Sequence, residues 1–380
     1  MLLRRQIFTE SAHESLFFWG ARQTGKSTLL ASLFPDALWF DLLMADVYER
    51  LLRNPTYLRE TVLAKPDITT VVIDEVQRLP ELLNEIHWLI ANTKCRFIMS
   101  SSSARKILRS NTNLLGGRAL RYQLYPLVSA EIPDFDLLKA LNHGLLPRHY
   151  QAAQPKKLLA AYVGSYLNDE IISEAKIRNV QVFAQFLESA AFSNAEIVNY
   201  ANIASDCGVS APTIKEYFQI LQDTLIGNFV PVYQRQPKRR VIQAPKFYFF
   251  DVGIVNHLLK RTGIVFKSEA FGYAFEQFIY QELRAHSHYA GLEYLISYWR
   301  TSSQLEVDFI LGSNQVAIEV QGTDNISSKH LRGLRAFMEE YTVQKAIVVC
   351  TEPLTRIHDG IIIMPWQEFL KQLWQGEIIS

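Results

Sequence analysis

The sequence has few cysteines and no long apolar run. Its 380 residues include three cysteines, Cys95, Cys207 and Cys350, whose separation fits no zinc or redox spacing. No apolar segment approaches the ~18 residues of a membrane-spanning helix, and the opening residues turn polar too early for a signal peptide. These absences exclude a disulfide-stapled scaffold, and we expect a cytoplasmic protein without membrane contact.

Neither positive nor negative charge is in excess. Lysine and arginine total 39 and aspartate and glutamate total 38, which leaves a net charge of +1. This balance excludes a globally basic nucleic-acid coat but allows a local basic patch. The hydrophobic fraction of 48% is enough for sizeable cores. At roughly 150 residues each, the length predicts two to three domains.

A glycine-rich segment follows the first apolar run. Residues 16–19, LFFW, predict a short buried strand. The next eight residues, GARQTGKS, fit the pattern G-x-x-x-x-G-K-[ST], and the apolar run from Thr28 to Phe34 predicts a helix. Strand, loop and helix in this order are the context of a Walker A phosphate-binding loop.

The residue types in this loop suit the tail of a nucleoside triphosphate. Gly20 and Gly25 let the backbone wrap around phosphates, whose charge the main-chain N–H groups match. Lys26 would pair with the β- and γ-phosphates, and the Ser27 hydroxyl would bind Mg²⁺. The predicted nucleotide-binding residues are Gly20, Ala21, Arg22, Gln23, Thr24, Gly25, Lys26, Ser27 and Thr28.

Two acidic residues end a second apolar strand. Residues 69–73, TTVVI, are a β-branched run typical of a buried parallel strand, and Asp74 and Glu75 follow it directly. Ligands collect at the carboxyl ends of strands in an open α/β sheet. We therefore expect Asp74 to hold Mg²⁺ through water and Glu75 to orient or deprotonate the attacking water.

Two further side chains are candidates for catalysis. A third predicted strand, residues 96–99, ends in the run Ser100 to Ser103, and the Ser100 hydroxyl could sense the γ-phosphate; a plain polar loop would look the same. Arg118 follows two glycines and could stabilise transition-state charge in a neighbouring subunit. The alternative for Arg118 is a solvated surface arginine.

Four segments resemble the successive motifs of one family. They read GARQTGKSTLL, VVIDEVQRLPEL, FIMSSSSARKIL and LLGGRALRYQLYPLVSAEI. They resemble a family of prokaryotic AAA+ ATPases whose members carry a C-terminal domain of unknown function with a nuclease-like fold, and the likeness covers nearly the whole chain. The resemblance implies ATP, Mg²⁺ and a homo-oligomer. One departure is Ser100 to Ser103, where the family usually has Thr-Gly-Ser-Ser.

The middle of the chain is mostly helical in pattern. Residues 137–146 and 156–174 carry apolar residues at helical spacing, which fits a helical lid or a generic linker domain. Residues 193–234 predict a helix-turn-helix that turns at Cys207-Gly208-Val209. The following segment would be a wing that contacts nucleic acid, DNA being the expected partner. Its basic residues are Arg235, Lys238, Arg239, Arg240 and Lys246. The alternative is a winged helix that packs on protein.

The C-terminal part contains a predicted β-hairpin with acidic residues. If Ser313 and Asn314 form the turn, Asp308 lies opposite Glu319 and Glu306 lies opposite Gln321. The alternation of side chains would place all four on one face of the hairpin, away from the apolar residues. Two carboxylates across a ladder repel each other, so we expect Mg²⁺ or a lysine to compensate.

The order of elements and the spacing Asp308…Glu319-x-Gln321 resemble the restriction-endonuclease-like fold. The resemblance implies a metal held by Asp308 and Glu319 and a glutamate on the first helix, for which Glu276 is the best match and Glu282 the second. The family pattern has a lysine where this chain has Gln321. The residues thus allow a vestigial nuclease site or an active one, or a half-buried hairpin with a polar outer face.

These observations predict an α/β protein of three domains. Residues 1–130 would be the AAA+ P-loop ATPase core with a parallel sheet, residues 131–262 a helical lid with a winged helix, and residues 263–380 a restriction-endonuclease-like domain. The leading hypothesis is a Mg²⁺-dependent ATPase that couples nucleotide state to a nucleic-acid-contacting module. The rival is a nucleotide-controlled protein-binding switch or scaffold whose nuclease-like domain is inactive.

Overall fold

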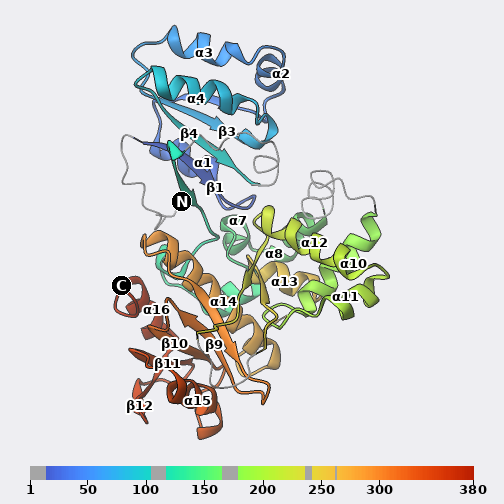
Figure 1. The fold of residues 1–380 in the computed structure, drawn as a ribbon, viewed down its shortest axis with the longest axis vertical. Helices are drawn as coiled ribbons and strands as arrows, with labels where there is room; N and C mark the ends of the chain where they lie inside the picture. Colours follow the sequence, from blue (N-terminus) through green and yellow to red (C-terminus); the bar gives the residue numbers. More distant parts are fainter. Residues whose placement is uncertain (1–13, 104–116, 165–178, 236–241, 262) are drawn as a thin grey trace. The chain divides into compact units, whose positions relative to one another are not determined.

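The computed structural model describes residues 14–103, 117–164, 179–235, 242–261 and 263–380 (Figure 1). The chain forms two compact units. Ile7–Tyr125 and Ile220–Ile226 belong to the N-terminal unit, and Pro126–Gln219 and Gly227–Ser380 make up the C-terminal unit. Among the described residues, every helix is too short or too polar to cross a lipid bilayer.

The N-terminal unit is built on a five-stranded sheet in the order β2-β3-β4-β1-β5. Every pairing is parallel, which confirms the predicted parallel core. The strands are β1 (Ser15–Trp19), β2 (Leu38–Asp41), β3 (Thr70–Asp74), β4 (Arg96–Ser101) and β5 (Ala119–Gln123). All residues of β1 and β3 are buried, as the apolar residues 16–19 and 71–73 within them predict.

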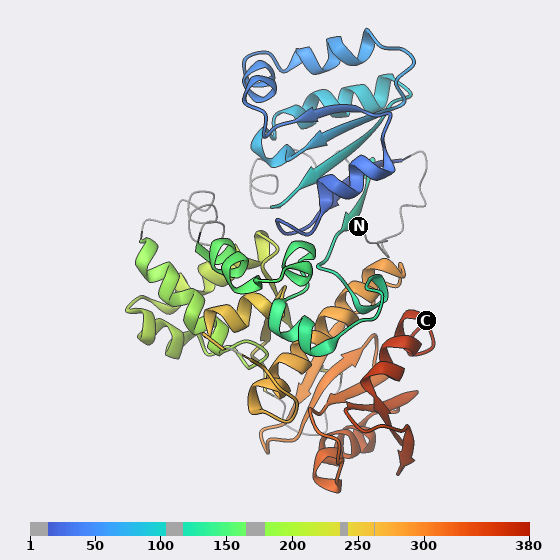
Figure 2. The ribbon, with the colours of Figure 1, turned by 180° about the vertical axis from the view of Figure 1, so that it is seen from behind.

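Helices cover both faces of this sheet (Figure 1 and Figure 2). They are α1 (Lys26–Leu33), α2 (Ala45–Arg53), α3 (Thr56–Leu63) and α4 (Leu82–Asn92). Leu51, Leu58 and Ile86, one from each of the last three helices, pack in one core with Val71 and Ile73 of β3. The loops at the carboxyl ends of β1, β3 and β4 are left to form a site.

The first part of the C-terminal unit is helical. Its helices are α6 (Leu137–His143), α7 (Pro147–Gln151), α8 (Pro155–Ala161), α10 (Val180–Phe192), α11 (Tyr200–Cys207), α12 (Ala211–Asp223) and α13 (Val252–Leu258). The last residues of α12, from Ile220 on, are counted with the N-terminal unit. The α11–α12 turn lies where it was predicted, and Gly208 takes the left-handed conformation there (φ 64°). α10 ends at Phe192, and α11 begins after its N-cap Asn199, whose side chain accepts a hydrogen bond from the Asn202 N–H.

An antiparallel pair of strands follows these helices. β6 (Gly227–Val230) pairs with β7 (Lys246–Phe249), and aromatic residues of the pair pack on α12: the rings of Phe218 and Phe247 lie 4.8 Å apart. Residues 236–241, which include Lys238, Arg239 and Arg240 of the predicted wing, lie outside the described residues.

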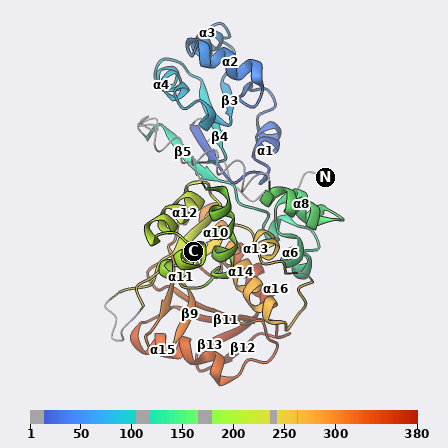
Figure 3. The ribbon, with the colours of Figure 1, turned by 90° about the vertical axis from the view of Figure 1, so that its right-hand side faces the viewer.

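The rest of the C-terminal unit is a six-stranded mixed sheet in the order β12-β13-β11-β10-β9-β8. The strands are β8 (Ile296–Arg300), β9 (Glu306–Leu311), β10 (Val316–Val320), β11 (Lys345–Cys350), β12 (Arg356–His358) and β13 (Ile361–Pro365). The helices are α14 (Glu269–Tyr289), α15 (Arg332–Glu340) and α16 (Trp366–Trp374). α14 and α16 cover one face and α15 covers the other (Figure 3).

The predicted hairpin register is confirmed, but the predicted polar face is not. Val316 pairs with Leu311, Ala317 with Ile310 and Ile318 with Phe309. Helices cover both faces of the sheet, so neither face of the hairpin is open to water. Val307 packs on the α15 side with Ile310, whereas Phe309 packs on the α14 side. The alternation therefore breaks at Asp308, where the β8–β9 register shifts as in a β-bulge.

Candidate nucleotide site and carboxylate cluster

The predicted phosphate-binding loop connects β1 to α1. Gly25 precedes α1 in the left-handed conformation (φ 95°), which glycine adopts without strain. A side chain at Gly20 would have its Cβ 2.7 Å from the main-chain oxygen of Leu124, so only glycine fits this close approach. The loop is further closed by Thr24 Oγ1, which donates a hydrogen bond to the Ala21 oxygen at 2.8 Å. The local sequence thus forms a preshaped, narrow loop.

The Lys26 side chain lies inside this loop. It is 5% exposed, and its Nζ donates to the main-chain oxygens of Gly20 at 2.8 Å and Ala21 at 3.2 Å. Burial lowers the pKa of Lys26 to about 8, although the carboxylates of Glu75 and Asp74 act to raise it. Two carbonyl oxygens accept hydrogen bonds from the ammonium but do not neutralise its charge. A phosphate group would supply the missing negative charge.

Asp74 and Ser100 meet at the ends of neighbouring strands. Asp74 ends β3, Ser100 lies in β4, and the Ser100 hydroxyl donates a hydrogen bond to Asp74 Oδ1. The same hydroxyl accepts from the Glu75 main-chain N–H at 3.2 Å. Both side chains are buried, so the hydroxyl fixes the orientation of the Asp74 carboxylate.

Glu75 is held by two polar side chains that the sequence did not single out. Ser102 Oγ donates to Glu75 Oε2 at 2.9 Å, and Gln77 Nε2 donates to the same oxygen and to Ser102 Oγ. Glu75 itself has a left-handed backbone (φ 58°), a strained conformation for a glutamate. Gln77 and Ser102 therefore determine where the Glu75 carboxylate lies. The sequence signal for Gln77 was its position two residues after Glu75.

The four-serine run replaces a glycine turn by side-chain hydrogen bonds. Ser101 Oγ donates to the Ser103 oxygen at 2.6 Å and accepts from the Ser103 N–H at 3.2 Å. These bonds close the turn after β4 without the glycine that the family usually has there. Ser100 and Ser102 remain directed at Asp74 and Glu75.

The remaining predicted residues of this site lie on its outer parts. Ser27 and Thr28 are exposed in the first turn of α1. The Ser27 hydroxyl and the Asp74 carboxylate are hard oxygen donors of the kind that Mg²⁺ prefers. They would hold the ion, which neutralises charge on the phosphates. Arg118 is exposed beside β5, and its guanidinium makes a hydrogen-bond contact with His87 Nε2.

A second polar site lies in the C-terminal unit. We call Glu276, Glu306, Asp308 and Glu319 the carboxylate cluster. Lys246 Nζ lies 2.7 Å from Glu306 Oε1 and 3.3 Å from Glu276 Oε1, and Tyr248 donates to Glu276 Oε1 at 2.6 Å. Lys246 is 2% exposed. The expected compensating cation is therefore a lysine, and it comes from β7, distant in sequence.

This finding corrects the prediction that Lys246 contacts nucleic acid. Its ammonium is sequestered by two carboxylates and cannot reach a phosphate backbone. Burial alone would lower the pKa of Lys246, but the carboxylates of Glu276, Glu306 and Asp308 together raise it above its usual value. Of the predicted basic segment, Arg235 is exposed, and Lys238, Arg239 and Arg240 lie outside the described residues.

The two residues predicted to hold a metal share this environment. Asp308 Oδ2 accepts from the Val320 N–H at 2.8 Å, and Gln321 Nε2 donates to Glu319 Oε1 at 2.9 Å. Burial, followed by the mutual repulsion of neighbouring carboxylates, raises the pKa of Asp308 and of Glu319. Raised pKa values mean that the pair readily keeps a proton. In the described part of the chain no three His, Cys, Asp or Glu side chains are arranged to hold a metal.

Glu282, the second candidate for a helix glutamate, lies elsewhere. Its carboxylate accepts from the Ser129 N–H at 2.7 Å, from Ser129 Oγ at 2.9 Å and from Trp374 Nε1 at 2.7 Å. Burial raises the pKa of Glu282 to about 7. It connects α14 with α16 and the segment after β5, so the structure corrects its assignment from metal ligand to a structural hydrogen-bond acceptor.

Comparison with protein families agrees with the geometry of the first site. Residues 12–132 match the model of an AAA domain. This match supports a P-loop ATPase of the AAA type. Beyond the AAA domain, residues 134–264 match a domain of unknown function (DUF8612) and residues 271–369 match another (DUF4143). No curated protein matches the chain.

Solved structures give distant likenesses. A Walker-type ATPase of Pyrococcus abyssi is 13% identical with a TM-score of 0.42, and the match covers 65% of this chain and 91% of that one. AMPPCP-bound DnaA of Aquifex aeolicus is 13% identical with a TM-score of 0.28, covering 56% and 82%. Domain III of Thermotoga maritima DnaA is 15% identical with a TM-score of 0.22, covering 57% and 86%. At these values the likenesses establish neither function nor a shared architecture.

Proposed function

We propose that the protein is a Mg²⁺-dependent ATPase that couples its nucleotide state to a nucleic-acid-contacting module, with a nuclease-like centre that does not cut. The observation that carries the first part is the hydrogen-bonded set at the ends of β3 and β4. Ser100 orients Asp74, and Ser102 and Gln77 orient Glu75. Two carboxylates fixed near a buried lysine are what phosphoryl transfer to water needs.

Each residue has one task in this mechanism. Main-chain N–H groups from Gly20 to Thr28 and the Lys26 ammonium bind the phosphates. Ser27 and Asp74 would hold Mg²⁺, and the ion would neutralise charge on the phosphates. Glu75 accepts a hydrogen bond from the attacking water and aligns it with the γ-phosphorus. Ser100 contacts the γ-phosphate region, and Arg118 serves a neighbouring subunit of a homo-oligomer.

The inactive state of the nuclease-like centre is proposed from Lys246. Its ammonium already compensates the negative charge that would attract a divalent ion, and a proton held by Asp308 and Glu319 reduces that charge further. Gln321, at the position where the fold usually has a lysine, brings no charge to assist a nucleophile. We infer a centre that keeps the family residues and serves as a structural core of the C-terminal unit.

One experiment distinguishes nucleic-acid contact from the alternative, a nucleotide-controlled protein-binding switch. ATP turnover is measured with and without single- and double-stranded DNA, and a plasmid is incubated with the protein and Mg²⁺ or Mn²⁺. We expect turnover that DNA stimulates and a plasmid that stays intact. Nicking that disappears in Asp308→Ala would refute the inactive centre.

The rival function is a nucleotide-controlled protein-binding switch. It is favoured by the burial of Lys246, which removes one cation from the basic segment and leaves Arg235 as its exposed residue among those described. Turnover that is indifferent to every DNA tested would support the switch over nucleic-acid contact. Either result leaves the ATPase itself standing, because hydrolysis is measured in both arms.

A further inference from the structure

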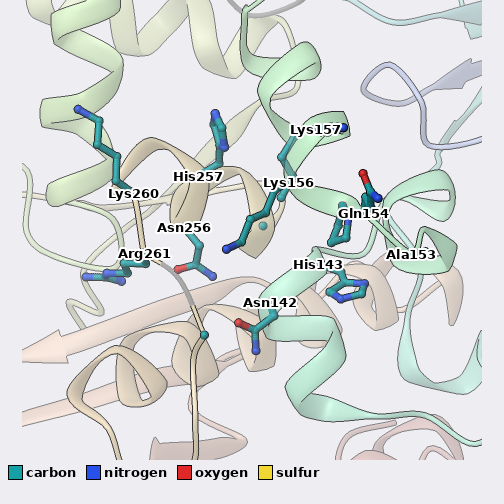
Figure 4. A pocket seen from close by; sticks show the side chains of 14 residues that line it. Asn142, His143, Ala153, Gln154, Lys156, Lys157, Asn256, His257, Lys260 and Arg261 are labelled. Atoms are coloured by element: carbon teal, nitrogen blue, oxygen red, sulfur yellow. The ribbon is translucent and has the colours of Figure 1, made fainter.

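The helical part of the C-terminal unit contains a cavity of about 730 Å³. α6, α8 and α13 provide most of its wall (Figure 4). Six basic side chains line it, and no aspartate or glutamate is among the described residues of the wall. These six are His143, Lys156, Lys157, His257, Lys260 and Arg261, and we call the cavity the basic pocket.

The positive charge of the basic pocket is poorly compensated from within the protein. Lys260 has a loose ion pair with Glu188, at 3.9 Å, in which both side chains are mostly exposed. Arg261 lies over the ring of Tyr273, 5.6 Å from its centroid. No ion pair involves Lys156 or Lys157 within the part of the chain that the structure describes. Cations gathered around a cavity raise the local concentration of anions.

A buried polar atom in the wall also lacks a partner. Asn256 is 5% exposed, and its Nδ2 donates to the Leu141 oxygen at 2.8 Å, which fixes the amide. Among the described residues, Asn256 Oδ1 has no hydrogen-bond donor and His143 Nδ1 has no hydrogen-bond partner. Buried polar atoms are nearly always paired, so an unpaired one beside a cavity is a place where a bound group or an ordered water is held. A ligand that meets Oδ1 would offer it an N–H or O–H donor.

One of the lysines lies close to the amide of Asn256. Figure 4 shows Lys156 reaching from α8 toward Asn256 of α13, while Lys157, His257 and Lys260 lie farther out along the rim. Burial lowers the pKa of His143 and of His257, so both rings are neutral near pH 7. The lysines and Arg261 therefore carry the charge of the pocket, and the neutral rings and amides can read a polar ligand.

We propose that the basic pocket binds a nucleoside monophosphate unit, with its phosphate on Lys156 and a hydroxyl or amino group on Asn256 Oδ1. Lysines are point-charge binders of phosphate, and the cavity has the volume of a small-molecule site. The unit could come from a free nucleotide or from the phosphorylated end of a nucleic-acid strand. This site is separate from the phosphate-binding loop and does not depend on ATP hydrolysis.

Calorimetry on the full chain tests the proposal, with Lys26→Ala in every sample to suppress binding at the phosphate-binding loop. AMP is the probe and adenosine the control without phosphate. We expect AMP to bind, adenosine to bind at least about tenfold more weakly, and Lys156→Glu to weaken AMP by about tenfold or more. Lys371→Glu, an exposed lysine of α16 away from the pocket, should leave AMP binding unchanged.

A 5′-phosphorylated trinucleotide and its 5′-hydroxyl counterpart separate the two sources. Tighter binding of the phosphorylated strand than of AMP would assign the pocket to strand ends, and tighter binding of AMP would assign it to free nucleotides. Absence of binding by all phosphorylated probes overturns the proposal, as does AMP binding that Lys156→Glu leaves intact. Lys156 is exposed, and an unchanged melting temperature confirms that the variant folds. A negative result would not bear on the proposed ATPase activity, because every sample carries Lys26→Ala.

Discussion

The ammonium of Lys246 lies 2.7 Å from Glu306 Oε1, although the two residues belong to different family-defined regions of the chain. Lys246 comes from β7 beside the helices of the middle region, and Glu306 begins β9 of the C-terminal sheet. Arg300 binds the other oxygen of Glu306 at 3.1 Å. This buried pairing connects the middle helices to the six-stranded sheet within one compact unit.

The first prediction concerns the stability that depends on Lys246. Lys246→Met removes the buried ammonium from the half-buried carboxylates of Glu276 and Glu306, and only Glu306 keeps a second ion pair, with Arg300. We expect a loss of about 3–5 kcal/mol of unfolding free energy in the C-terminal unit. The midpoint of urea unfolding, followed by tryptophan fluorescence, measures it.

Lys267→Met is the matched control. Lys267 pairs with Asp324 at the same distance of 2.7 Å, but both side chains are largely exposed. Solvent screening limits this pair to less than about 1 kcal/mol. Equal effects of the two substitutions would show that burial of the Lys246 pair contributes nothing.

The sequence was sufficient for the parts of the fold with strong local signals. The phosphate-binding loop, the buried β3 with Asp74 and Glu75 at its end, and the β9–β10 register all follow from short patterns. Each depends on residues close in sequence, so the periodicity and spacing of those residues are enough to predict it. The register of β9 was correct because the tight turn near Ser313 fixes it.

The partners of the carboxylate cluster could not be found in this way. Lys246 stands 60 residues before Glu306 in the numbering of the chain and within a run of basic residues that reads as a solvated segment. Its burial depends on how β7 packs beside β8 and α14, which no local pattern encodes. The break of alternation at Asp308 was missed for a similar reason, because a bulge is set by the neighbouring strand.

The second prediction is a pH dependence of stability. Glu282 has a raised pKa of about 7 in the folded protein, against 4.5 for an ordinary glutamate. The folded state therefore binds the proton more tightly, and this contribution to stability is present at low pH and lost as the pH rises from about 4.5 to 7. Wild-type unfolding free energy should fall over this window by on the order of 2 kcal/mol more than that of Glu282→Gln.

The comparison between the two proteins isolates Glu282. Asp251, whose pKa burial raises to about 6, titrates in both and cancels in the difference. Urea midpoints at a series of pH values give the two curves. Parallel curves for wild type and Glu282→Gln would mean that the carboxylate is not protonated on folding.

The third prediction tests the residues that position Glu75. Gln77→Ala removes one of its two side-chain donors, so the carboxylate should move away from the water. We expect kcat for ATP to fall about tenfold with KM nearly unchanged, because these side chains orient the base and do not bind the nucleotide.

Ser102→Ala supplies the internal check on this network. Ser102 and Gln77 hold the same Glu75 oxygen and bond to each other at 2.9 Å. The double variant should therefore lose little more activity than either single variant. Additive losses would argue that the two side chains act independently, and an unchanged kcat in both would remove them from the mechanism.

The measurement that bears most directly on the nucleotide site is ATP binding and turnover by wild type, Lys26→Ala and Glu75→Gln in Mg²⁺ buffer. Wild type should bind and hydrolyse ATP, Lys26→Ala should bind at least about a hundredfold more weakly, and Glu75→Gln should bind like wild type with turnover reduced by about a hundredfold or more. Wild type that shows no affinity for ATP, or Glu75→Gln that hydrolyses it at the wild-type rate, would contradict the account.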